Sequence, residues 1–166
     1  MVQRVVGIVG WKNNGKTTLV ERLVAHLVQR GLRVSTVKHA HHAVDIDQPG
    51  KDTWRHRQAG ATEVVLATAR RWALIHELRG ADEPPLEAIL AKLAPCDLVL
   101  VEGFKAWPHP KIEVHRATRG TPLLAVGDPS IVAIASDVPL PGLDRPVFAL
   151  DDVAAIASFL LERGRG

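Results

Sequence analysis

A glycine-rich segment near the start of the chain has the residue types needed to bind a phosphate chain. Gly10 and Gly15 are separated by four residues and are followed by Lys16 and Thr17, as in the P-loop pattern. Glycine lets the backbone come close to a ligand, whose phosphate oxygens are then wrapped by backbone N–H groups. The lysine brings a cation to the β- and γ-phosphates, and the threonine offers a hydroxyl to Mg²⁺.

The segment therefore predicts a Mg²⁺-nucleotide site. The predicted nucleotide-binding residues are Gly10, Asn13, Asn14, Gly15, Lys16, Thr17 and Thr18. The alternative is a glycine-rich turn between a strand and a helix that binds no ligand. The order of an apolar run, a loop and a helical pattern favours the nucleotide site.

Phosphoryl chemistry also needs an acid that organises Mg²⁺ or water. The apolar run between Asp97 and Glu102 predicts a buried strand that supplies one. Glu102 falls at the carboxyl end of this strand, where ligands of open α/β sheets bind, so we predict it as a catalytic acid and Mg²⁺ ligand. Asp97 falls at the opposite end, which indicates a structural role. The alternative for Glu102 is an ion pair with Lys105 or Lys111.

A polar loop is expected to follow the second strand and to reach the same rim of the sheet. Within it, Asp45 is a predicted Mg²⁺ ligand and Asp52 a predicted catalytic acid. His39, His41 and His42 form a cluster that could bind a transition metal instead. The alternative for the whole segment is a solvated loop.

Hydrophobic periodicity predicts strands that alternate with helices. Predicted strands cover 5–9, 32–37, 63–68, 72–78, 98–101, 111–115, 131–135 and 147–150. Predicted helices run from residue 16 to the glycine at 31, and over 51–59, 84–93 and 151–162. The adjacent runs 63–68 and 72–78 predict a β-hairpin. Such alternation is typical of a mostly parallel sheet covered by helices on both faces, and the length of 166 residues predicts one domain, 1–166.

Composition narrows the function classes. The chain is 46% hydrophobic and 23% charged with a formal net charge of +3, which suits a phosphate-bearing ligand. The sequence has no stripe of basic residues interleaved with aromatic residues, the pattern that would indicate nucleic-acid binding. The single cysteine, Cys96, allows no internal disulfide. No run long enough to span a membrane and no leader pattern is found, so we expect a cytoplasmic protein.

The chain resembles a known family in several short motifs that follow one another in a fixed order. They are GWKNNGKTTL at 10–19, Lys38-His39, Asp47-x-x-Gly50-Lys51-Asp52-Thr53-Trp54-Arg55, Ala59-Gly60-Ala61 and Leu100-Val101-Glu102-Gly103-Phe104-Lys105. The family is MobB, the adaptor proteins of molybdopterin-guanine dinucleotide biosynthesis. The likeness runs from about Val5 to Val114 and is looser through Ala135-Ser136-Asp137.

This resemblance implies a P-loop NTPase fold with three α/β/α layers, a mostly parallel sheet and a β-hairpin insertion. It also implies a homodimer that binds GTP and Mg²⁺ and hydrolyses GTP slowly. The implied partners are a MobA-type guanylyltransferase and other proteins of molybdenum cofactor assembly. Gly15, Lys16 and Thr17 carry over as phosphate and Mg²⁺ residues, Glu102 as the strand-end acid and Asp52 as a switch acid.

Guanine recognition rests on the resemblance, because the sequence has no Asn-Lys-x-Asp motif. We expect Asp137, which follows a predicted strand, to contact the base. The alternative is an Asp that forms a turn.

Two other functions remain open from the sequence. One is a nucleotide-dependent metallochaperone that uses the three histidines. The other is a small-molecule kinase with Arg55 and Arg57 in a lid.

Overall fold

The computed structural model describes residues 4–40 and 44–163. Its internal contacts divide the chain into two compact units, one made of residues 1–39 and 92–166 and the other of residues 40–91. Each unit is described by itself below. The expectation of a single nucleotide-binding domain over 1–166 stays a prediction.

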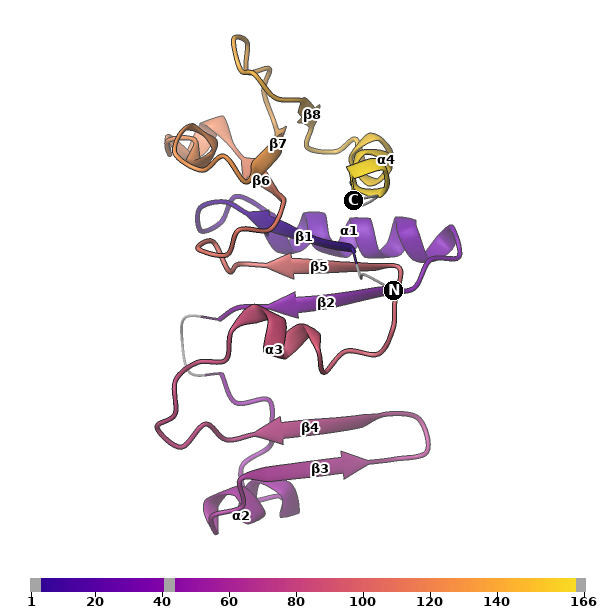
Figure 1. Cartoon of the computed structure of the whole chain (residues 1–166), viewed down its shortest axis with the longest axis vertical. Helices are drawn as coiled ribbons and strands as arrows, with labels where there is room; N and C mark the ends of the chain where they lie inside the picture. The colour runs from indigo at the N-terminus through magenta and orange to yellow at the C-terminus, as the bar shows by residue number, and fades with distance from the viewer. Residues whose placement is uncertain (1–3, 41–43, 164–166) are drawn as a thin grey trace. The chain divides into compact units, whose positions relative to one another are not determined.

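The first unit is built on a six-stranded sheet with the order β2-β5-β1-β6-β7-β8 (Figure 1). Each neighbouring pair is parallel, which confirms the predicted mostly parallel sheet. The strands are β1 Arg4–Val9, β2 Val34–Lys38, β5 Leu98–Glu102, β6 Lys111–His115, β7 Ile131–Ser136 and β8 Val147–Ala149. In a parallel sheet all carboxyl ends lie at one rim, so the residues that follow these strands are brought together there.

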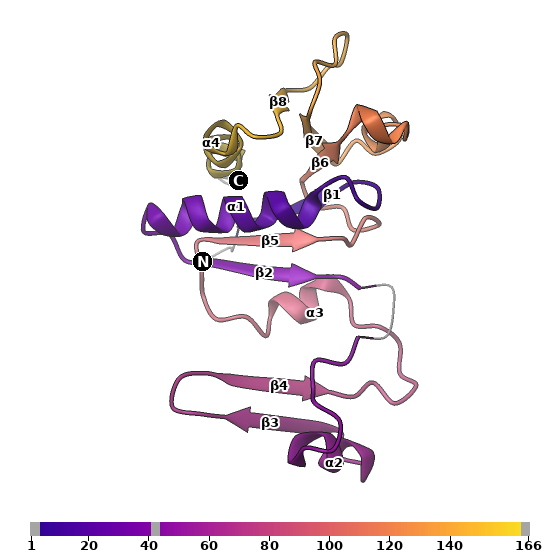
Figure 2. The same cartoon turned by 180° about the vertical axis from the view of Figure 1, so that it is seen from behind.

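Two helices that contact each other cover one face of this sheet, α1 Lys16–Gln29 and α4 Val153–Arg163 (Figures 1 and 2). Their apolar stripes and the strand residues facing them make the main core, which includes Ile8, Leu19, Leu23, Leu27, Leu100, Ile112, Val114, Ile156 and Leu160. Helix α4 begins two residues later than predicted. The carboxylate of Asp152 instead accepts the N–H of Ala155 at 3.0 Å and caps the helix.

A smaller cluster covers the other face near β6 and β7. It joins Val9, Ile131 and Ile134 to Ala125 of the 3₁₀ turn η2 Leu124–Val126. Alternate residues of a strand point to opposite faces, so Ile134 of β7 lies in this cluster and Ala135 in the main core. A second 3₁₀ turn, η1 Ala117–Arg119, connects β6 to this cluster.

The second unit contains helix α2 Asp52–Gln58, strands β3 Glu63–Ala67 and β4 Trp72–His76, and helix α3 Leu86–Leu90. The two strands form the predicted antiparallel hairpin, with Val65 opposite Leu74. Helix α3 is shorter than the predicted 84–93. The residue before Pro95 is disfavoured in helical conformation, which limits any extension toward that proline. Among residues 4–40 and 44–163, no helix has the length and apolar character required to cross a bilayer.

Candidate functional site

The loop between β1 and α1 is shaped by backbone conformations that favour glycine. Gly10 has φ of +145°, and a Cβ built there would lie 2.5 Å from the carbonyl oxygen of Val114. Gly15 has φ of +95° and is the N-cap residue of α1. Asn13 also adopts a positive φ of 65°. The loop therefore turns tightly at both ends and leaves the first N–H groups of α1 available to an anion.

Two of the three predicted Mg²⁺ residues, Thr17 and Glu102, lie together at this loop. The hydroxyl of Thr17 donates to Glu102 Oε1 at 2.9 Å, because β5 runs beside β1 and ends next to the start of α1. Lys38, the strand partner of Glu102 on β2, places its Nζ 3.4 Å from the same Oε1. The ammonium of Lys16 donates to the carbonyl of Trp11 at 2.8 Å.

The charges around this site favour an anionic ligand. Burial lowers the pKa of Lys16, Glu102 partly offsets that effect, and the positive charges of Lys105 and Lys38 lower the pKa further. Three lysines therefore surround the Glu102 carboxylate, and the local charge is positive. A polyphosphate bound among them would stabilise the ammonium form of Lys16 and restore its pKa.

A cavity of about 460 Å³ lies over the loop. It is lined by Lys12, Asn13, Gly15, Lys16, Thr17, Thr18, Glu102 and Arg119. Asn14 is placed differently, because its side chain is fully buried and its amide donates to the carbonyl of Val114 at 3.0 Å. Its observed contact supports the loop from beneath, and a direct contact with nucleotide stays a prediction.

Asp137 lies just after β7 at the same rim. Its Oδ1 accepts the N–H of Ala117 at 2.9 Å, a contact with a distant segment of the chain. It lines a cavity of about 270 Å³ together with Arg22, Arg116 and the segment 149–151. It also borders an apolar cavity of about 420 Å³ formed by Val138 to Pro141 and Val147 to Ala149. Asp137 therefore sits beside apolar and polar walls of the kind that hold a heterocyclic base.

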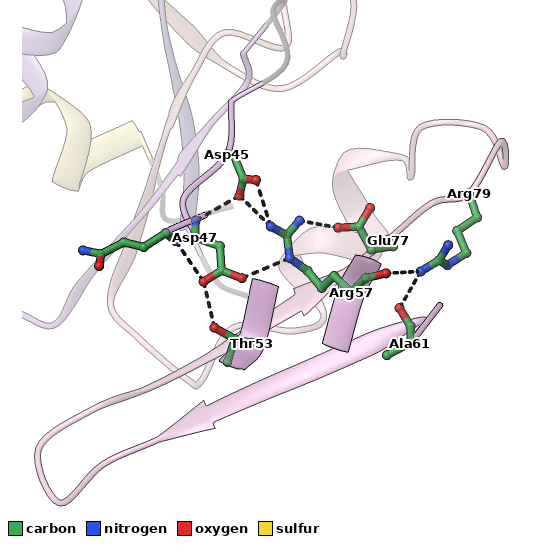
Figure 3. A network of polar contacts seen from close by, with 8 residues as sticks. Asp45, Asp47, Thr53, Arg57, Ala61, Glu77 and Arg79 are labelled. Atoms are coloured by element: carbon green, nitrogen blue, oxygen red, sulfur yellow. Dashed lines mark hydrogen bonds and ion pairs between the residues drawn. The ribbon is translucent and has the colours of Figure 1, made fainter. Parts of the chain in front are cut away.

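Asp45 is engaged within the second unit. Both of its carboxylate oxygens accept from the guanidinium of Arg57, at 2.9 and 2.8 Å (Figure 3). The same guanidinium pairs with Asp47 at 3.1 Å and with Glu77 at 2.5 Å. Hydrogen bonds from Arg57 lower the pKa of Asp45. The predicted Mg²⁺ role of Asp45 would require it to leave this ion pair, and that role stays a prediction.

Asp52 is the first residue of α2 and lines a separate cavity of about 500 Å³ with Trp54, Arg55 and His56. Its catalytic role stays a prediction. Arg57, one of the two arginines considered for a kinase lid, is held among three carboxylates and its side chain is only 9% exposed. This placement does not favour the lid function.

The histidine cluster is only partly described. The ring of His39 stacks on Phe104 with 4.4 Å between ring centroids, and its backbone N–H donates to the carbonyl of Glu102. His41 and His42 lie outside the described residues. Within 4–40 and 44–163, no three or more His, Cys, Asp or Glu side chains gather closely enough to hold a metal ion.

The sequence interpretation missed Lys38, Arg116 and Arg119 as site residues. Lys38 ends β2, Arg116 directly follows β6, and Arg119 ends the turn after it. Their positions in the sequence could have identified them, because residues at the carboxyl ends of parallel strands share one rim of the sheet. Basic side chains at those positions are candidates for phosphate binding.

The parallel sheet, the P-loop and the strand-end acid beside Thr17 define a P-loop NTPase-like α/β protein with a β-hairpin. The chain matches the family described as "Molybdopterin guanine dinucleotide synthesis protein B" over residues 5–137. The chain therefore belongs to the MobB family, as the motifs predicted.

Individual relatives agree with this assignment. The chain is 40% identical over 161 residues to the molybdopterin-guanine dinucleotide biosynthesis adapter protein of Haemophilus influenzae, covering 93% of this chain and 86% of the relative. It is 40% identical over 155 residues to the adapter protein of Escherichia coli, covering 92% and 88%. A crystal structure of molybdopterin-guanine biosynthesis protein B (mobB) superposes with a TM-score of 0.76 at 30% identity, covering 96% of this chain and 99% of the other.

Proposed function

We propose that this protein is a GTP-binding adaptor that assists conversion of molybdenum cofactor to its guanine dinucleotide form. One observation carries the nucleotide part of the proposal. Thr17 and Glu102 are in direct contact at the edge of a cavity whose other walls are the P-loop and Lys16. A hydroxyl beside a carboxylate offers two oxygen ligands to Mg²⁺, and the loop binds the phosphates that share the ion.

Charge supports a triphosphate as the ligand. Among the described residues that line the cavity, Lys12, Lys16 and Arg119 surround one carboxylate, that of Glu102. In the present arrangement, the ammonium of Lys38 lies beside that carboxylate. When Mg²⁺ binds Glu102, we expect the ammonium of Lys38 to move toward the γ-phosphate, because a second cation beside the metal would be repelled.

Guanine selection is assigned to Asp137. A carboxylate accepts the N1–H and the 2-amino group of guanine, whereas adenine presents an unprotonated N1 at the corresponding position. The neighbouring apolar cavity suits the face of a purine. We expect GTP to bind better than ATP for this reason.

Slow hydrolysis is expected. Among the described residues, the cavity lining includes Glu102 and Arg119 but no Gln that would orient an attacking water. A P-loop enzyme without a residue in that role hydrolyses its nucleotide slowly. A protein that holds GTP without consuming it quickly fits an adaptor better than an independent catalyst.

The adaptor part rests on the relatives, which are named molybdopterin-guanine dinucleotide biosynthesis adapter proteins. We infer that the partner is a MobA-type guanylyltransferase, which would receive a GTP-bound or cofactor-bound form of this protein. A cytoplasmic location and a homodimer belong to the same proposal.

The hairpin supports the homodimer. Val65 and Trp72 are 59% and 69% exposed, and the register of β3 and β4 puts their side chains on one face of the ribbon. A two-stranded ribbon is marginally stable alone, and exposed apolar faces mark interaction surfaces. We propose that a second copy of the chain covers this face.

Calorimetric titration tests the proposal. GTP and ATP, each with Mg²⁺ and with EDTA, are titrated into the wild-type protein, Lys16→Ala and the exposed control Lys92→Ala. We expect GTP to bind more tightly than ATP, and Lys16→Ala to lose about 2–3 kcal/mol of binding free energy because a charge-assisted contact is removed.

Lys92→Ala should bind like the wild type. The proposal of a GTP site fails if the wild type binds neither nucleotide, or if Lys16→Ala binds GTP normally. Capture of purified guanylyltransferase by the GTP-loaded protein tests the adaptor part separately.

A further inference from the structure

Arg116 connects the phosphate-binding loop to the rim residue Asp137. Arg116 directly follows β6, and its Nε donates to the backbone carbonyl of Asn14 at 3.1 Å. Its guanidinium lies against Gly15, where a built Cβ would be 3.4 Å from Nη2. One side of this side chain is therefore fixed to the P-loop.

Arg116 also lines the cavity of about 270 Å³ beside Asp137, which we call the base cavity. Nη1 of Arg116 lies 4.0 Å from Oδ2 of Asp137. The two residues emerge together because His115 and Ser136 are the last paired residues of β6 and β7. The next backbone N–H, that of Ala117, donates to Asp137 Oδ1 at 2.9 Å.

These contacts give each oxygen of Asp137 a nearby donor while one part of the guanidinium stays on the loop. A guanidinium is planar and always charged, so it can address two acceptors in a fixed geometry. A lysine in its place would have one ammonium that is too compact to serve both acceptors in the same way. The carboxylate is 23% exposed, which leaves it accessible from the cavity it lines with Arg22.

We propose that Arg116 is a positioning residue for base selection, which holds Asp137 toward the 2-amino edge of guanine and ties that orientation to the P-loop. The inference rests on the proposed GTP site and adds the residue through which the phosphate and base ends of that site are coupled. When phosphate orders the loop, the carbonyl of Asn14 and therefore Arg116 become fixed. Asp137 then meets the base in one orientation.

Titration with three probes separates phosphate binding from recognition of the base. GTP, ITP and inorganic tripolyphosphate are titrated with Mg²⁺ into the wild type, Arg116→Lys, Asp137→Asn and the double variant. ITP lacks only the 2-amino group, and tripolyphosphate lacks the nucleoside. Arg119→Lys is the matched control, because Arg119 lines the phosphate cavity and not the base cavity. Urea unfolding without ligand verifies that each variant is folded.

We expect the wild type to prefer GTP over ITP by about tenfold to hundredfold, the value of one hydrogen bond to a charged group. Arg116→Lys should reduce this preference by at least about fivefold and leave tripolyphosphate affinity within about twofold of the wild type, because one orienting contact to Asp137 is lost. The double variant should show the same preference as Asp137→Asn alone, since Arg116 acts on the base only through Asp137. Arg119→Lys should weaken all three probes alike.

An unchanged GTP preference in Arg116→Lys would overturn the inference while leaving the GTP site intact. The same holds for an additive double variant, or for equal losses of all three probes in Arg116→Lys. If the wild type binds GTP and ITP equally, Asp137 does not recognise the 2-amino group and this inference falls with it. If the wild type binds no GTP, the proposed function itself has failed.

Discussion

At the scale of single residues, the P-loop requires glycine for its backbone geometry, independently of any contact with a ligand. Gly10 approaches Val114 so closely that a side chain has no room. The sequence predicted this loop from the fixed spacing of its residues, and the acid Glu102 from its place at the end of an apolar strand. It did not predict Lys38 or Arg116, whose roles depend on which strands are neighbours in the sheet.

Gly10→Ala should weaken GTP binding by about fivefold to hundredfold, the cost of moving a strained backbone segment. The new Cβ would stand 2.5 Å from the Val114 carbonyl, so the loop has to shift. Equilibrium titration with GTP measures the effect. Gly31→Ala is the control, because Gly31 also has positive φ, of +81°, but no atom within 4 Å of a built Cβ. Normal GTP affinity in Gly10→Ala would contradict the prediction.

Asp128 carries a pH-dependent contribution to stability. Burial raises the pKa of its carboxyl, but hydrogen bonds from Ser130 and from the buried Lys111 outweigh that effect and hold the pKa below its usual 3.8. A lowered carboxyl pKa stabilises the folded state above the unfolded value, and the stability is lost as pH falls through the folded value.

Asp128→Asn should therefore lower the free energy of unfolding by about 1–3 kcal/mol near neutral pH, since Lys111 loses its charged partner. The gap to the wild type should narrow as the pH falls below about 3.8. Urea unfolding of both proteins at a series of pH values measures the gap. A gap that stays constant down to the lowest pH would exclude the carboxylate as its source.

At the scale of elements, strands β6 and β7 hold the turns that reach the site. Glu113 is fully buried, and its two carboxylate oxygens accept the N–H groups of Leu124 and Ala125 at 2.9 and 2.8 Å. The indole of Trp11 donates to the carbonyl of Pro122 at 2.7 Å and joins the P-loop to the same segment. Periodicity predicted these strands, but the two 3₁₀ turns are too short to have a periodic signal.

Glu113→Ala should destabilise the protein by about 2 kcal/mol or more, because two backbone N–H groups at the start of η2 lose their buried acceptor. Glu113→Gln keeps one acceptor oxygen and should lose less. Urea unfolding gives both values. Equal stability of the two variants would show that the N–H contacts are not the source of the effect.

At the scale of the whole molecule, the proposed dimer depends on the hairpin face. The adjacent strand-like runs 63–68 and 72–78 predicted the ribbon, but a sequence does not distinguish a face covered by the same chain from one covered by a second copy. Trp72 and Val65 are exposed in the single chain. If a second copy of the chain covers this face, replacing either side chain should weaken self-association.

Trp72→Ser should weaken self-association by about tenfold or more, as expected for an aromatic side chain central to an interface. Sedimentation velocity over a range of protein concentrations measures the dissociation constant. Val126→Ser is the control, because Val126 is 82% exposed and lies outside the hairpin. A wild-type protein that stays monomeric at high concentration, or a Trp72→Ser protein that dimerises normally, would exclude this interface.

The Arg57 cluster has a consequence for how the second unit tolerates change. Asp45 and Asp47 lie near the point where the chain enters this unit, and Glu77 lies shortly after its last hairpin strand. One guanidinium therefore connects the segment before α2 to the segment after β4 (Figure 3). The entropic cost of closing a loop grows only slowly with its length, so a segment whose ends are held by these ion pairs should tolerate a longer or shorter hairpin.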